Sequence, residues 1–271
     1  MFAAASWERD LRADRFDPRL TLWVAALAAL AVLNAGLWLW MASTLSPPTS
    51  YAESQLVLSA VYVGVCGFRS LFPRVDLERI CLWDSWLSTI MLGRTAATIA
   101  EMCFALQCGL FVQKLSELTG LPALAWAAQA FVPLALVAQL CCWYAVLSLN
   151  HLGHAVEETL WALIMGILAL SAGAAGFASQ GGLAWLLLTG AVVYALGAGL
   201  TLAFDVSMYV SRRRAWGNVD RLPLALGLRD CRVRRKPTKS WEVWRQEVAW
   251  MTLYFSIGVW TSLAMVLLDW A

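Results

Sequence analysis

Seven long apolar runs constrain this chain more than any other feature of its sequence. Each run holds about 20 or more mostly uncharged residues, the length that a helix needs to cross the hydrocarbon of a bilayer. Because lipid offers the backbone no hydrogen-bond partners, a spanning segment satisfies its own amides by forming a helix. We therefore predict an all-α, polytopic integral membrane protein, a seven-transmembrane-helix bundle with spans at residues 20–43, 53–72, 84–112, 123–148, 157–177, 183–210 and 246–269.

The composition excludes the soluble classes. Of the 271 residues, 61% are hydrophobic and 14% are charged, whereas soluble domains carry about 25% charged residues. There is too little charge to cover a water-exposed surface of this size, and the length suits one bundle. We expect a single membrane domain over residues 1–271, with residues 211–245 as its one large loop outside the membrane.

The distribution of basic residues predicts the orientation. Residues 211–245 hold eleven basic residues against three acidic ones, a net charge of +8, and the first loop, residues 43–52, holds no Lys or Arg. The segment before the first span adds Arg9, Arg12, Arg15 and Arg19. Since basic loops stay in the cytoplasm, we expect a cytoplasmic N-terminus, an outside C-terminus and residence in a plasma or inner membrane.

The basic loop at 211–245 has two interpretations. It is a topology signal, or it is also a surface for anionic lipid headgroups, which attract basic residues beside a membrane at about 1 kcal/mol each. The loop contains no nucleic-acid recognition motif, so we expect no nucleic-acid partner. The expected partners are the lipid bilayer and, within it, a hydrophobic small molecule.

The third span carries charges at depth. Arg94, Thr98 and Glu101 fall on one helical face, because the two charged residues are seven positions, or about two turns, apart. Ionisable groups inside a membrane usually face the bundle interior or a wet cavity. One interpretation is an ion pair that orders the bundle; the other is a site in which Arg94 holds an anionic group and Glu101 exchanges protons.

The only two histidines of the chain lie between the fourth and fifth spans, in the segment Asn150-His151-Leu152-Gly153-His154-Ala155-Val156-Glu157-Glu158. If this segment is helical, His151, His154 and Glu158 share a face. Imidazole and carboxylate ligands suit zinc or iron, so His151 and His154 are the candidate metal ligands. The same groups suit acid–base chemistry, or only a polar turn. The pattern is not H-E-x-x-H, and the histidine boxes of membrane desaturases are absent.

Further polar residues lie near the cytoplasmic ends of the last two spans, where Asp205 and Tyr209 are four residues apart and Glu247 lies just inside the boundary. With the predicted orientation, all of these groups converge on one leaflet. The candidate catalytic residues are Glu101, Glu157, Glu158 and Asp205, and the candidate substrate-binding residues are Arg94, Asn150, Tyr209 and Glu247.

Three functions would use such a set. The first is a membrane-embedded enzyme that acts on a lipid or isoprenoid-like substrate by carboxylate and histidine acid–base chemistry, or through a metal. The second is a proton-coupled transporter, and the third is a non-catalytic subunit or sensor. Many carriers are built from two related halves, and this chain shows no internal repeat. The enzyme is therefore the preferred hypothesis.

Overall fold

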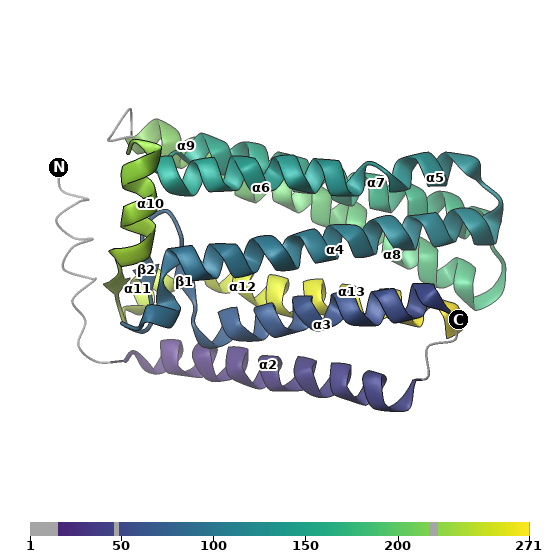
Figure 1. Ribbon diagram of the computed structural model, residues 1–271, viewed down its shortest axis with the longest axis horizontal. Helices are drawn as coiled ribbons and strands as arrows, with labels where there is room; N and C mark the ends of the chain where they lie inside the picture. Colours follow the sequence, from purple (N-terminus) through teal and green to yellow (C-terminus); the bar gives the residue numbers. More distant parts are fainter. Residues whose placement is uncertain (1–15, 46–48, 217–221, 271) are drawn as a thin grey trace.

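The computed structural model describes residues 16–45, 49–216 and 222–270. Within these ranges seven helical runs are long and apolar enough to cross a membrane, which confirms the predicted multi-pass helical bundle. The arginines before Phe16, and residues 217–221 of the basic loop, lie outside the described residues. Figure 1 shows the spans lying side by side along the long axis of the molecule.

Four spans are single helices, and three contain an interruption. The single helices are α2 (Pro18–Thr44), α3 (Ser50–Leu71), α4 (Ile90–Thr119) and α7 (His151–Ala178). The interrupted spans are α5 (Pro122–Ala128) with α6 (Phe131–Ser148); α8 (Gly181–Leu200) with a π-helical turn (Thr201–Val206) and α9 (Ser207–Trp216); and α12 (Val248–Leu253) with a π-helical turn (Tyr254–Gly258) and α13 (Val259–Val266). A 3₁₀ turn, Leu267–Trp270, ends the described chain.

A small structured cap covers one end of the bundle, here called the basic end (Figure 1). Strand β1 (Arg74–Val75) pairs antiparallel with β2 (Ile80–Cys81), which pairs parallel with β3 (Lys236–Pro237). Helices α10 (Leu224–Val233) and α11 (Trp241–Trp244) complete the cap. The ion pair between Arg79 and Asp230, at 2.7 Å, ties the loop between α3 and α4 to the basic loop. The basic loop is therefore largely folded.

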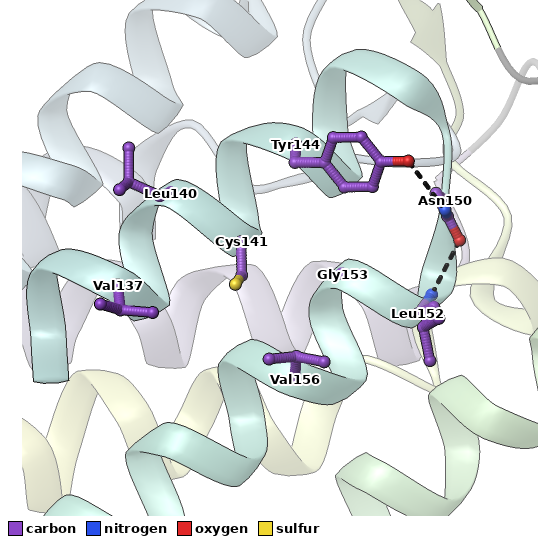
Figure 2. Close-up of a pocket in the computed structure, with 8 residues that line it drawn as sticks. All are labelled: Val137, Leu140, Cys141, Tyr144, Asn150, Leu152, Gly153 and Val156. Atoms are coloured by element: carbon purple, nitrogen blue, oxygen red, sulfur yellow. Dashed lines mark hydrogen bonds between the residues drawn. The ribbon is translucent and has the colours of Figure 1, made fainter.

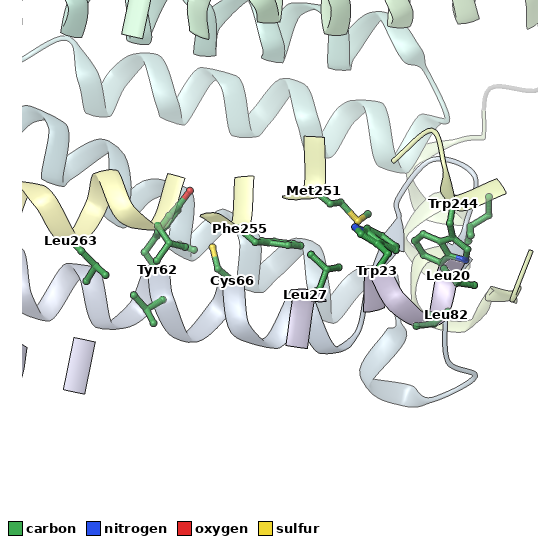
Figure 3. Packing of buried hydrophobic residues seen from close by; sticks show 14 of the residues in the cluster. Leu20, Trp23, Leu27, Tyr62, Cys66, Leu82, Trp244, Met251, Phe255 and Leu263 are labelled. Carbon is green, nitrogen blue, oxygen red and sulfur yellow. The ribbon is translucent and has the colours of Figure 1, made fainter. Parts of the chain in front are cut away.

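The last span packs against the first two through large side chains. Figure 3 shows Trp23 and Leu27 of α2 near Met251 and Phe255 of the last span, all within one buried cluster. The indole nitrogen of Trp23 also donates to the hydroxyl of Thr252 at 3.2 Å. Packing and interhelical hydrogen bonds of this kind hold membrane helices together, because lipid supplies no hydrophobic drive between them.

Two helix starts differ by six residues from the predicted spans, and both affect the candidate site. The third span begins at Ile90 rather than at 84, because Trp86–Ser88 forms a separate 3₁₀ turn. The fifth begins at His151 rather than at 157. There Leu149 adopts a left-handed backbone, φ 57°, and the side chain of Asn150 accepts a hydrogen bond from the Leu152 amide at 3.1 Å. This cap starts the helix early, so both histidines lie in its first turns.

Candidate functional site

A buried charged network surrounds Arg94 in the half of the bundle nearer the basic end. Arg94 Nη2 donates to Glu101 Oε2 at 2.7 Å and to Gln139 Oε1 at 3.2 Å. The Gln139 amide nitrogen donates to Glu101 Oε2 at 2.6 Å, and the Thr98 hydroxyl donates to Gln139 Oε1 at 2.9 Å. The predicted face of α4, which carries Arg94, Thr98 and Glu101, therefore contacts Gln139 of α6.

Two further spans reach the same carboxylate. The Tyr254 hydroxyl, from the π-helical turn of the last span, donates to Glu101 Oε1 at 3.1 Å. Arg69 of α3 lies with its Nη1 3.9 Å from the same oxygen and stacks over the Tyr254 ring at 5.6 Å. Glu101 thus has partners from four spans, which fixes its position in the bundle interior.

The loop after α3 adds a second ion pair at the basic end. Arg74 Nε lies 3.4 Å from Asp76 Oδ1, and Asp76 Oδ2 lies 4.0 Å from Arg94 Nη1. A Cβ atom on Gly93 would lie 1.3 Å from the Arg74 Cζ, so the guanidinium occupies the space that a side chain at Gly93 would need. The half-buried Asp76 therefore connects the loop to Arg94.

The charges that lie close together here shift the pKa values of both Arg74 and Asp76. Burial, together with the nearby cations Arg69 and Arg94, lowers the pKa of Arg74 to about 10, although Asp76 opposes this shift. Burial alone would raise the pKa of Asp76, but Arg74, Arg94 and Arg69 together hold it below its ordinary value. Asp76 is therefore held in its ionised form by three arginines.

His154 and Glu157 form the second part of the site. His154 Nδ1 lies 2.6 Å from Glu157 Oε2, and the other carboxylate oxygen of Glu157 lies 4.0 Å from Arg94 Nη1. Cys142 of α6 approaches the same ring nitrogen, with Sγ 3.9 Å from His154 Nδ1. Within the described residues, Cys142, His154 and Glu157 are the group whose donor atoms all lie within 4.8 Å of one another.

Helices α6 and α7 meet closely at this level because of Gly153. A Cβ atom there would lie 2.7 Å from the Cys141 carbonyl oxygen and 2.8 Å from the Ala145 Cβ. No larger residue fits without moving the helices apart. The glycine therefore allows Cys142 on α6 to come near His154 on α7.

The other candidate residues lie around this core. Tyr209 stacks on the ring of His154, with centroids 4.9 Å apart, and His151 lies 6.2 Å from the same tyrosine. His151 is outside the close donor group. Glu158 is half-buried next to Glu157. Asp205, on the π-helical turn before α9, makes no hydrogen bond or ion pair with the described part of the chain.

Asn150 and Glu247 lie at the rim of the basic end. Arg213 donates to the Asn150 side-chain oxygen at 2.5 Å. Glu247 accepts from the Trp250 indole nitrogen, and its Oε1 lies 3.7 Å from Arg212 Nη2. Burial raises the pKa of Glu247, against the opposing effects of these two partners. Arginines of α9 therefore occupy the positions next to both predicted substrate-binding residues.

An apolar groove runs along the outside of the α6–α7 seam (Figure 2). Its volume is about 420 Å³, and its walls include Val137, Leu140 and Val156. Tyr144 and Asn150 lie at one end, where the Asn150 amide donates to the Tyr144 hydroxyl at 3.5 Å. Cys141 and Gly153 line the groove, whereas the adjacent Cys142 and His154 belong to the interior cluster.

Several members of the cluster were not among the residues singled out from the sequence: Arg69, Arg74, Asp76, Gln139, Cys142 and Tyr254. One signal was available, because Gln139 is the only strongly polar residue within residues 131–142.

The cluster combines side chains chemically able to exchange protons, namely His154 and Glu157, with side chains able to bind anions, namely Arg94 and Arg69. A protein interior of low polarity strengthens such interactions with a substrate. The donor set at Cys142 can also hold a metal ion. The chain matches no family model, no curated protein and no solved structure.

Proposed function

We propose that this multi-pass membrane protein is an enzyme that acts on a lipid or isoprenoid-like substrate within the bilayer. One observation carries the proposal: the buried Arg94 lies 2.7 Å from Glu101 and 4.0 Å from Glu157, which are both buried, and 4.0 Å from the half-buried Asp76. Desolvating so many ions is costly, and helix association does not require it. Their retention in one place is what chemistry on a substrate would need.

The roles follow from the contacts. His154 and Glu157 are 2.6 Å apart, so either can give or take a proton from the other and pass it to a substrate. Arg94 and Arg69 would bind a negatively charged headgroup or a developing negative charge. Glu101 positions Arg94, and Tyr254 and Gln139 hold Glu101 in turn. Glu158 and Asp205 are additional proton-exchanging groups beside this set.

The outer groove supports a lipid as the substrate class. Its volume of about 420 Å³ lies within the range of roughly 300–1,000 Å³ found for ligand sites. Val137, Leu140 and Val156 offer apolar contact to a chain. At the polar end of the groove, the Asn150 side chain accepts a hydrogen bond from Arg213. His154 lies about one helical turn further along α7. An anionic headgroup at Asn150 would therefore be near the interior cluster.

The basic end is proposed to face the cytoplasm of a plasma or inner membrane. Helix α10 crosses the end of the bundle, at a steep angle to the spans (Figure 1). It exposes Leu224 and Leu226 together with Arg229 and Arg232. An exposed face that mixes apolar and basic residues is typical of a helix lying in an anionic membrane surface. This arrangement supports anionic headgroups as partners of residues 211–245.

A proton-coupled carrier is the second candidate function. It is favoured by the series of carboxylates around Arg94, which extends from Asp76 in the loop to Glu101 inside α4. Such a series could pass protons between the basic end and the bundle interior. In this case Arg94 would bind the transported solute rather than a reacting lipid.

Lipid analysis of host membranes tests the proposal. Membranes from cells expressing the wild type, Glu157→Gln or the exposed control Glu117→Gln would be compared by mass spectrometry. We expect at least one lipid species to change with the wild type and the control but not with Glu157→Gln. Identical lipid profiles in all three would refute the enzyme. Proton uptake into liposomes that depends on Glu157 would then establish the carrier.

A further inference from the structure

We infer that Cys142, His154 and Glu157 form a binding site for a divalent transition metal, with zinc as the preferred ion. Their three donor atoms come from two helices and lie within 4.8 Å of one another. All three residues are buried. The inference deepens the proposed function and rests on it only for the role of the ion, because ion binding is measurable without turnover. With the ion bound, His154 and Glu157 act as its ligands, in place of the proton exchange between them described above.

The donor chemistry fits zinc. Zinc binds thiolate, imidazole and carboxylate ligands in a tetrahedral arrangement. A thiolate from Cys142 and a carboxylate from Glu157 would together balance the two positive charges of the ion. Oxygen-rich sites suit magnesium or calcium instead, and the sulfur of Cys142 disfavours both.

Residues next to the proposed ligands hold them in position. Glu157 directs Oε2 towards His154 and has Oε1 4.0 Å from Arg94 Nη1, so the arginine orients the carboxylate from behind. Tyr209 covers the imidazole face of His154 at 4.9 Å. Outer-shell partners of this kind fix ligand orientation, and their loss typically lowers metal affinity about 10–100-fold.

The site differs from the one predicted from the sequence. His151 and His154 were the expected pair, but His151 is not within the close donor group, and the sulfur of Cys142 takes the third place. The close approach at Gly153 makes this substitution of ligands sterically feasible. Three protein ligands leave the fourth position of zinc open, as in catalytic rather than structural zinc sites. A polar group of the substrate would bind there.

The chain offers a matched control beside every proposed ligand: Cys141 for Cys142, His151 for His154, and Glu158 for Glu157. Each control has the same chemistry and a neighbouring position, but lies outside the donor group. Replacing Cys by Ser, His by Ala and Glu by Gln in both members of each pair therefore separates ligation from general damage to α6 or α7.

The test is metal analysis of the full-length protein in detergent, followed by titration of the metal-stripped protein with Co²⁺. We expect roughly one zinc per chain, a near-ultraviolet thiolate-to-cobalt absorption band, and loss of this band in Cys142→Ser but not in Cys141→Ser. His154→Ala and Glu157→Gln should weaken affinity at least about 10-fold, and their controls should not.

Two results would overturn the site: a folded wild type that binds neither zinc nor cobalt, or equal loss of the metal in ligand and control variants. The wild-type cobalt band reports the thiolate even where a variant fails to fold. If lipid conversion depends on Glu157 while no metal binds, the enzyme proposal survives without the metal. If metal binds but no lipid changes, the site stands and the enzyme proposal fails.

Discussion

Two buried polar networks join α3, α4 and the last span, and they differ in charge. Towards the basic end, Arg69, Glu101 and Tyr254 connect these three spans through ions. Further along α4, the Gln107 amide donates to the carbonyls of Gln55 and Ser262, at 3.1 and 3.3 Å. The Ser262 hydroxyl donates back to Gln107 at 2.6 Å, and the Gln55 amide donates to the Gln107 carbonyl at 3.0 Å.

The contrast shows what helix association requires in this bundle. Neutral amides and a hydroxyl join the same three spans without any buried charge. The ion pairs around Arg94 therefore exceed what cohesion needs, and they occur where His154 and Glu157 also lie. This difference is the physical basis for assigning chemistry to the charged network and cohesion to the neutral one.

The largest expected effect comes from removing the charge at the centre of the first network. Arg94→Leu leaves Glu101 and Glu157 without their cation, and breaking a buried ion pair costs about 3–5 kcal/mol. We expect a loss of this size in the free energy of unfolding, measured by denaturant titration in detergent micelles. Arg229→Leu, at an exposed position of α10, should change it by less than about 0.5 kcal/mol. Equal effects of the two variants would contradict the assignment.

A smaller loss is expected from separating α6 and α7 beside the charged network. In Gly153→Ala the added methyl group meets the Cys141 carbonyl oxygen and Ala145, and such overpacking costs about 1–3 kcal/mol. Gly166 of the same helix has open space at this position, so Gly166→Ala should be neutral or stabilise by up to about 1 kcal/mol. Thermal unfolding of both variants checks this prediction. A Gly153→Ala protein as stable as the wild type would show that the seam is not tight.

Substitutions in the neutral network should lower the free energy of unfolding only slightly. Gln107→Leu removes hydrogen bonds to α3 and the last span, and such bonds in membranes are worth about 0.6 kcal/mol on average and about 1.7 at most. We expect a destabilisation in this range by the same denaturant titration. Lipid conversion should remain at the wild-type rate, and its loss would show that the two networks do not divide the roles as described.

The smallest effect is the pH dependence that Asp76 adds. Since its folded pKa lies below its ordinary value, ionised Asp76 contributes stability that is fully present above about pH 4 and is lost as the pH falls through the folded pKa. Unfolding measured from about pH 6 to about pH 3 should show a shallower acid decline in Asp76→Asn than in the wild type. Asp84→Asn, at a largely exposed side chain, should retain the wild-type decline. If the stability of Asp76→Asn and of the wild type declined in parallel as the pH falls, ionised Asp76 would contribute no stability and would not belong to the network.

The sequence was sufficient for the helices and for contacts within one helix. Seven apolar runs predicted seven spans, and the seven-residue spacing of Arg94 and Glu101 placed both on one face of α4, where the structure joins them. A start at His151 was missed because Asn150 can belong either to a loop or to a helix cap.

Contacts between helices could not be predicted in the same way. A helix that is apolar all round carries no periodic signal for its rotation in a bundle. The sequence of α6 therefore did not indicate that Gln139 faces Arg94 or that Cys142 rather than Cys141 faces His154. The close approach at Gly153, which decides the second contact, depends on the three-dimensional packing of α6 on α7.

The most direct test of the central claim is the double variant Arg94→Met/Glu101→Leu, measured for both unfolding and lipid conversion. Replacing a buried ion pair by apolar residues of similar volume is often neutral or stabilising by about 1–4 kcal/mol. Arg69, Asp76 and Glu157 would each lose a charged partner here. The claim that this network serves chemistry therefore predicts a folded protein that is less destabilised than Arg94→Leu and that converts no lipid. A folded double variant that converts lipid at the wild-type rate would contradict it.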